Sequence, residues 1–567
     1  MRSDLTRAAA WCCSGLLLVP VHAGATGTRQ AAPAQAPPVL RVTTRLVQVN
    51  VVVHSKNGAP VVGLAKDDFE ITDAGVRQQI ATLSVESMLP PLPAPGASPA
   101  AALPPNVFTN EAYFNPVTPR AITVILLDGL NTPVADQAYA REQLIRFLHT
   151  LTPDDRVALY SLGGNLRILH DFTDDPMALL DALVRHKPHI GPELALSNPV
   201  PANTGDSEID AFLDSANQTV ADFEIIDRVR TTLDGLQAIA RRVAAIPGRK
   251  NLVWISGGFP LDIGVDQMTL GGNAERRSFS DDVEQAARAV TAAQLAIYPV
   301  DARGPMTNPA LSASALTPKD IRQPVPGLSR AMEDILDTHA TMQTLAQRTG
   351  GRAYYNSNDL TGAIRGAMDD AKVTYLLGYY PTHDAWDGTF HVLKVRVKRA
   401  GVQVRHRQGY FAFATPARTE QTRRAALLEA ARSPLDATGI AVTARLAADV
   451  PVKGSLRMLL VIEPRHLTFE EKAGHWAGAV DVLLMQQAAP GTDVTVTNDT
   501  MRLDYAREGF QEVMTRGLIM VKDFDRAAAA YKLRVVVRDV ASGNVGSVSI
   551  RTDTTRPRQP AAAADRK

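Results

Sequence analysis

The sequence predicts an α/β protein in which a Rossmann-like, doubly wound and mostly parallel sheet lies between β modules on either side in the chain. Ala121–Leu127 (AITVILL) and Asn251–Ser256 (NLVWIS) are apolar almost throughout, as is typical of strands buried on both faces of a parallel sheet. Segments with helical spacing separate these runs, and such alternation of strands and helices indicates a doubly wound sheet. Before and after this region apolar and polar residues alternate instead, which favours antiparallel β structure.

The central region contains enough further elements to complete one α/β domain. Its helices have ordinary lengths, and the helix that ends at Thr349 is followed by Gly350-Gly351, a regular C-cap signal. The predicted strands are Arg156–Leu162, Leu166–Phe172, Leu295–Asp301 and Arg352–Tyr355, and the predicted helices are Asp136–His149, Pro176–His186, Ile209–Ile246, Asp281–Ala293, Met332–Thr349 and Leu360–Lys372.

Changes in composition predict the domain boundaries. The flanking β segments have the strand spacing of immunoglobulin-like modules, and a stretch rich in Pro and Ala cannot bury enough apolar surface to fold. The predicted parts are a small β domain at 40–87, a Pro/Ala-rich linker at 88–119, the α/β domain at 120–372, a β extension at 373–413 that completes the first β module, a helical linker at 414–435, a C-terminal β-sandwich at 436–555 and a disordered tail at 556–567.

The N-terminus predicts export. Arg2 and Arg7 precede an apolar stretch that ends near Ala23-Gly24-Ala25, so residues 1–25 are interpreted as a signal peptide and 26–39 as a disordered leader. An uncleaved N-terminal anchor is the alternative. The only two cysteines lie in this segment, so the mature protein would have no disulfide, zinc-thiolate site or cysteine nucleophile. No later apolar run is long enough to span a bilayer, and we expect a periplasmic or secreted protein.

Charge and motif content argue against several function classes. The chain has 60 Lys and Arg against 59 Asp and Glu, so no net field attracts nucleic acid. We find no His-Glu-x-x-His pattern, no Gly-x-Ser-x-Gly elbow and no glycine-rich phosphate loop, and we therefore predict that the protein is not an enzyme. An extracytoplasmic hydrolase with a site assembled from distant loops remains an alternative.

The order of short motifs along the chain resembles one family. These motifs are VILLDGLNT, NLVWISGG, IYPVD, LAQRTGGRAYY, YLLGYYP and RHRQGYF. Their order is similar to that in the von Willebrand factor A-related proteins of acidobacteria and other soil bacteria. Together with the β segment and the Pro-rich stretch that precede the motifs, the resemblance covers about Arg41–Phe413. The resemblance implies a Rossmann-like A domain and an extracytoplasmic location, and it implies little about activity.

The resemblance also implies a candidate metal site. Von Willebrand factor A domains that bind metal carry Asp-x-Ser-x-Ser after the first strand, because Mg²⁺ prefers carboxylate, hydroxyl and water oxygens. The corresponding segment of this chain is Asp-Gly-Leu-Asn-Thr. Its Asp128 matches the anchoring carboxylate of the motif, and its Thr132 matches the last hydroxyl. Leu130 replaces the middle Ser, while Asn131 offers a carbonyl from a shifted position.

The remaining two ligands are also altered. Ser256 stands where the family has a second Asp, and Thr204 is the best candidate for the separate Thr. A site with one carboxylate would hold Mg²⁺ weakly, and the alternative is that Asp128 only caps the turn that follows it. We therefore expect a protein that binds another protein or a cell-surface polymer through a degenerate metal-ion-dependent adhesion site. A Mg²⁺-dependent adhesion protein, with the site completed by its partner, is the alternative.

Overall fold

A computed structural model of the chain describes most of the predicted folded parts. It describes residues 46–87, 106–110, 121–152, 154–192, 196, 202–244, 246, 248–258, 285–304, 328–383, 386–412, 419–447, 455–472, 474–489, 492–525 and 532–551. The predicted signal peptide, leader and tail, and most of the Pro/Ala-rich linker, lie outside these residues.

The central sheet has the strand order β10-β9-β6-β7-β8, with the first strand of the unit in the middle. β6 pairs in parallel with β7 and β9, β9 pairs in parallel with β10, and only β8 at the edge is antiparallel to its neighbour. This order confirms the predicted α/β fold with a mostly parallel sheet. The strands are β6 Ile122–Asp128, β7 Val157–Leu162, β8 Leu166–Thr173, β9 Lys250–Ser256 and β10 Leu295–Asp301.

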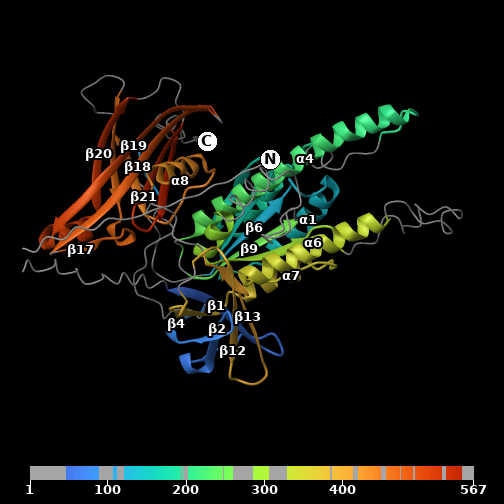
Figure 1. Ribbon diagram of the computed structural model, residues 1–567, viewed down its shortest axis with the longest axis horizontal. Coiled ribbons are helices and arrows are strands. Elements are labelled where there is room, and N and C mark those ends of the chain that lie inside the picture. The colour runs from blue at the N-terminus through green and yellow to red at the C-terminus, as the bar shows by residue number, and fades with distance from the viewer. Residues whose placement is uncertain are drawn as a thin grey trace, which may run out of the picture. The chain divides into compact units, whose positions relative to one another are not determined.

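Helices cover both faces of this sheet, because successive strand residues point to opposite sides. Ile122, Val124 and Leu126 belong to the core on one face, together with residues of α4 and α6. Ile125 belongs to the core on the other face, together with residues of α1, α2 and α7. Figure 1 shows these helices around the sheet. They are α1 Val134–Leu148, α2 Pro176–Arg185, α4 Ser207–Val243, α6 Leu328–Thr349 and α7 Leu360–Asp369.

The N-terminal β module is built from two parts of the chain that the α/β unit separates. β1 pairs with β11 and β13, and β2 pairs with β12, so strands before and after the α/β unit share both sheets. The sheets have the orders β13-β1-β11-β4 and β14-β12-β2-β3. The elements are β1 Val47–Ser55, the 3-10 helix η1 Lys66–Asp68, β2 Phe69–Asp73, β3 Val76–Gln78, β4 Ile80–Ser87, β11 Val373–Tyr379, β12 Phe390–Val397, β13 Val402–His406 and β14 Gly409–Phe411.

The C-terminal module also has two sheets, with the orders β20-β16-β15-β5 and β17-β18-β21-β22, and β19 pairs with β18. Its core consists mostly of aliphatic side chains from both sheets, together with Met458 and Phe524. The elements are β5 Val107–Thr109, α8 Glu420–Arg432, β15 Val442–Ala447, β16 Ser455–Ile462, the 3-10 helix η5 Pro464–His466, β17 Glu470–Lys472, β18 His475–Ala489, β19 Thr492–Ala506, α9 Arg507–Arg516, β20 Leu518–Asp525, β21 Lys532–Asp539 and β22 Val545–Arg551.

Strand β5 corrects the prediction of a continuous linker at 88–119. Val107–Thr109 pairs with β15 instead of remaining extended in solvent. The buried amide of Asn110 fixes this strand, since its Nδ2 donates to the carbonyls of Ala437 and Ile440, and its Oδ1 accepts from the amide of Val442. Helix α9, which the alternation pattern did not predict, likewise interrupts the C-terminal strands.

None of the helices in the described part of the chain combines the length and the apolar character that crossing a bilayer requires.

Gly351 provides a test of how closely the helical layer lies on the sheet. It follows Gly350, which ends α6 with a φ of 82°. A Cβ atom at Gly351 would overlap the carbonyl oxygen of Ile297 in β10. We expect Gly351→Ala to lower the free energy of unfolding by roughly 1–3 kcal/mol, the usual cost of overpacking. Urea unfolding followed by circular dichroism measures this loss.

Gly164→Ala is the matched control, because a Cβ atom there would meet nothing within 4 Å. It should change stability by less than about 0.5 kcal/mol. Equal effects of the two substitutions would contradict the close approach of the segment after α6 to β10.

Candidate functional site

The carboxyl ends of β6, β9 and β10 form the candidate site, and we call this edge of the sheet the rim. It comprises Asp128, the segment Gly129–Thr132, Ser256 and Asp301. Open α/β sheets bind ligands at this edge, because the loops that follow parallel strands meet there.

Asp128 is the centre of the rim and is 2% exposed. Its Oδ2 accepts hydrogen bonds from Asn131 Nδ2, Trp254 Nε1 and Ser256 Oγ, each at 2.9 Å. Its Oδ1 accepts from the backbone amide of Asn131 at 3.0 Å. Burial raises the pKa of the Asp128 carboxyl, while these hydrogen bonds lower it and do not fully offset the burial. Protein donors therefore take the place of solvent or ion around this carboxyl group.

Asn131 does not offer its carbonyl to the centre of the site. Its Oδ1 accepts from Arg228 Nε at 3.1 Å and from Arg228 Nη2 at 2.8 Å, and Arg228 is 7% exposed. Asn131 Nδ2 also donates to the hydroxyl of Thr232 at 3.1 Å. Both partners come from α4, so one helix supplies a guanidinium group and a hydroxyl to the rim. Asn131 Oδ1, which the sequence offers as a possible metal ligand, therefore accepts hydrogen bonds from the guanidinium group of Arg228.

Thr132 and Ser256 are also bonded within the protein. Thr132 Oγ1 accepts from the amide of Gly257 at 2.8 Å. The Ser256 hydroxyl contacts Asp128 and lies 3.2 Å from the amide of Gly258, which donates to it. Thus the structure brings together Asp128, Asn131, Thr132 and Ser256, as the sequence predicted, and it joins them directly to one another and to neighbouring backbone.

Thr204 does not join this group. It is exposed, and its amide and hydroxyl both donate to Asp210 Oδ1 at 2.7 Å, beside the start of α4. Thr204 was assigned by its order in the sequence alone, in an expanded loop. Thr232 lies at the rim instead, and its helical position within α4 hid it from a search for loop threonines.

A second carboxylate on the rim, that of Asp301, is paired with a cation of the chain. Asp301 ends β10 and is 3% exposed. Arg303 donates to both of its oxygens, at 2.9 and 2.8 Å, and His339 Nε2 lies 3.3 Å from Oδ2. His339 stacks on the ring of Tyr355 with 4.2 Å between ring centroids. Fork-shaped pairing of Arg with a carboxylate is among the stronger polar contacts in proteins.

Helix α4 continues beyond the rim on its N-terminal side. Arg228 and Thr232 mark the level at which the helix contacts Asn131, and Ser207–Asp227 precedes them. At 1.5 Å per residue this segment is about 30 Å long. We call Ser207–Asp227 the projecting segment. Figure 1 shows α4 extending past the ends of β6 and β9.

The strand order defines an open α/β domain, and the rim is the edge formed by the carboxyl ends of its central strands. No family model matches the chain, and no curated protein matches it. Several solved structures resemble it. An aerotolerance-related membrane protein from Bacteroides fragilis is 14% identical, with 44% of this chain and 98% of that chain covered and a TM-score of 0.23.

Two further structures cover more of this chain. A von Willebrand factor type A protein from Catenulispora acidiphila is 10% identical, with 84% of this chain and 74% of that chain covered and a TM-score of 0.23. The N-terminal domains of the pilus tip protein Mfa5 from Porphyromonas gingivalis are 10% identical, with 65% of this chain and 75% of that chain covered and a TM-score of 0.24. These identities and scores are too low to assign the chain to any of the three families.

Asp128 and Thr204 should differ sharply in their importance for stability. Asp128→Ala leaves the buried donors of Asn131, Trp254 and Ser256 without their acceptor, and we expect a loss of roughly 3 kcal/mol or more in the free energy of unfolding. Thr204→Ala removes only exposed contacts and should cost less than about 1 kcal/mol. Urea unfolding of the two variants provides the measurement, and a loss at Asp128 no greater than that at Thr204 would contradict the assigned network.

Proposed function

We propose that this chain is a binding protein, not an enzyme, and that it docks another protein on the rim and on the projecting segment of α4 without a metal ion. The observation that carries the proposal is an apolar stripe on the projecting segment. The hydrogen bonds among the rim residues support the proposal that docking needs no metal ion. Export to the periplasm or the medium is part of the proposal and rests on the N-terminal sequence.

The stripe follows the helical repeat and is exposed. Its large residues are separated by three, one, seven and three positions, so they lie along one side of the helix, with Ala216 filling the gap. Contiguous apolar side chains on a soluble protein mark sites of protein contact. The stripe consists of Ile209 (49% exposed), Phe212 (73%), Leu213 (36%), Val220 (45%) and Phe223 (67%).

Charge around the stripe indicates the chemistry of the partner. The projecting segment contains six acidic residues and no Lys, Arg or His. A second copy of the chain would place acidic side chains against acidic side chains, which disfavours self-association. The surface therefore fits a protein with an apolar groove edged by Lys or Arg, the arrangement in which a helix lies in a groove.

The rim gives the metal-dependent alternative little support. Hard cations bind through oxygen atoms that are free to coordinate. In the described rim, Asp128 accepts from four donors, and Asn131 accepts from Arg228. A magnesium ion would have to displace the hydrogen bonds to Asp128. It would also break the contact between Arg228 of α4 and Asn131.

Substitution of the stripe tests the proposed function. The double variant Phe212→Ser, Phe223→Ser should bind the partner at least about tenfold more weakly, since buried aromatic side chains dominate such interfaces. The measurement is retention of native envelope proteins on the immobilised full chain, with each retained protein then titrated individually. Retention should fall with rising salt and should be unchanged by EDTA.

Ser215→Ala, Asn217→Ala is the matched control, because both residues are exposed and polar on the same helix segment. It should bind like the wild type. A retained protein that binds the wild type and the double variant equally, or that is released by EDTA, would contradict the proposal. Circular dichroism confirms that both variants keep their helices.

A further inference from the structure

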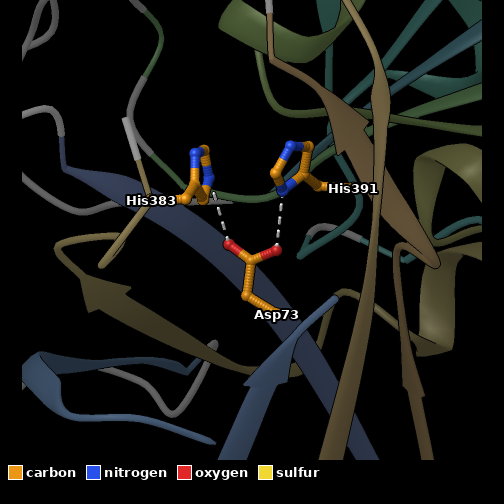
Figure 2. Close-up of side chains that lie close together, drawn as sticks. All are labelled: Asp73, His383 and His391. Carbon is orange, nitrogen blue, oxygen red and sulfur yellow. Dashed lines mark hydrogen bonds and ion pairs between the residues drawn. The ribbon is translucent and has the colours of Figure 1, made fainter. Parts of the chain in front are cut away.

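The N-terminal β module contains a group of metal-ligating side chains that lies apart from the rim. Asp73, His383 and His391 each offer one ligand atom, and these atoms lie within 4.8 Å of one another. Figure 2 shows both imidazole rings above the Asp73 carboxylate, each directing a nitrogen to a different oxygen. His391 Nδ1 lies 3.2 Å from Oδ1, and His383 Nε2 lies 3.6 Å from Oδ2.

Strand register places most of this group on one face of one sheet. Leu393 is the partner of Asp73 across β12 and β2, and His391 is the partner of Tyr410 across β12 and β14. Directly opposed residues, and residues two apart on a strand, point to the same face. Asp73, His391 and Tyr410 therefore converge inside the module. His383 reaches them from the segment that joins β11 to β12.

The charges of this group suit a divalent ion better than two protons. The His383 and His391 rings lie with their centroids 4.0 Å apart, so two imidazolium groups would repel each other. The Asp73 side chain is 1% exposed, and it forms ion pairs with the two histidines. The guanidinium of Arg407, which lies over the Tyr410 ring, also acts on this carboxylate electrostatically. A single divalent cation would compensate the buried carboxylate while both imidazoles stay neutral, as metal binding requires.

The distances and donor types point to zinc. In a tetrahedral zinc site with bonds of about 2.0–2.1 Å, ligand atoms lie about 3.3 Å apart. The distance of 3.2 Å between His391 Nδ1 and Asp73 Oδ1 is close to this value, and the ligand atoms of all three residues lie within 4.8 Å of one another. Imidazole ligands select zinc and later transition metals over Mg²⁺ and Ca²⁺.

Two tyrosines support the carboxylate from behind. Tyr379 and Tyr410 donate their hydroxyl hydrogens to Asp73 Oδ2 at 2.8 and 2.9 Å. The Tyr410 oxygen also lies 2.7 Å from His383 Nε2, a contact that a bound ion would replace. Ligating carboxylates in metal sites are held by such second contacts. This arrangement leaves Oδ1, on the side of His391, for an ion.

We propose that Asp73, His383 and His391 bind one zinc ion, which fastens the β11–β12 connection to β2 and β12. The fourth ligand is water. Trp386 packs beside this group, and its ring centroid lies 5.4 Å from that of His383. The ion has a structural role in the module and is independent of partner binding at the rim.

Zinc titration of the untagged full chain, after removal of metals with a chelator, tests the proposal. We expect calorimetry to give one zinc ion per chain and the melting temperature to rise with zinc, because an ion that binds only the folded state stabilises it. His383→Ala and His391→Ala should each weaken zinc binding more than about 100-fold, beyond the 10- to 100-fold effect typical of second contacts. His475→Ala is the matched control, since His475 is exposed and pairs with Asp504 in the C-terminal module.

Absence of stoichiometric zinc binding, or equal binding by the wild type and both histidine variants, would overturn the proposal. If a variant fails to fold, X-ray absorption of the zinc-loaded wild type decides the question without it. A first shell with two imidazoles and carboxylate oxygen supports the site. A shell without two imidazoles contradicts it.

Discussion

One buried carboxylate, Asp128, determines the structure of the rim. It ends the central strand of the sheet, where apolar neighbours exclude water and an unpaired polar group would cost several kcal/mol. Four hydrogen bonds from Asn131, Trp254 and Ser256 satisfy it. These bonds tie the turn after β6 to β9, and Arg228 extends the network to α4. The same bonds hold the rim together, and the proposal of a metal-free rim rests on them.

The α/β core could be predicted because its signal is local. AITVILL, NLVWIS and LAIYPVD are each long enough to read as buried strands, and the structure has β6, β9 and β10 there, all buried along their length except Leu127. Four of the five predicted rim residues also meet, since they directly follow strands whose ends share an edge. Thr204 was misplaced because order along the chain does not fix a position within an expanded loop.

The contacts that decide the chemistry could not be predicted, because they join distant segments. Arg228 lies 97 residues from Asn131 and sits in a helix whose polar residues give no sign of which one turns inward. His391 lies 318 residues from Asp73, on the far side of the inserted α/β unit. Val107–Thr109 was assigned to a linker because proline and alanine dominate its surroundings, although its own β-branched and aromatic residues favour a strand.

A rim stabilised in this way gives α4 a firm attachment at Arg228 and Thr232, from which its projecting segment extends with apolar residues exposed. The most direct test of the central claim is the indole N–H resonance of Trp254, assigned by loss in Trp254→Phe, during titration with Mg²⁺ and Mn²⁺. We expect this resonance to keep its shift and its protection from exchange, because the N–H is bonded to Asp128. A specific shift with Mg²⁺, together with selective broadening by Mn²⁺, would show that an ion replaces the protein donors and would contradict the account.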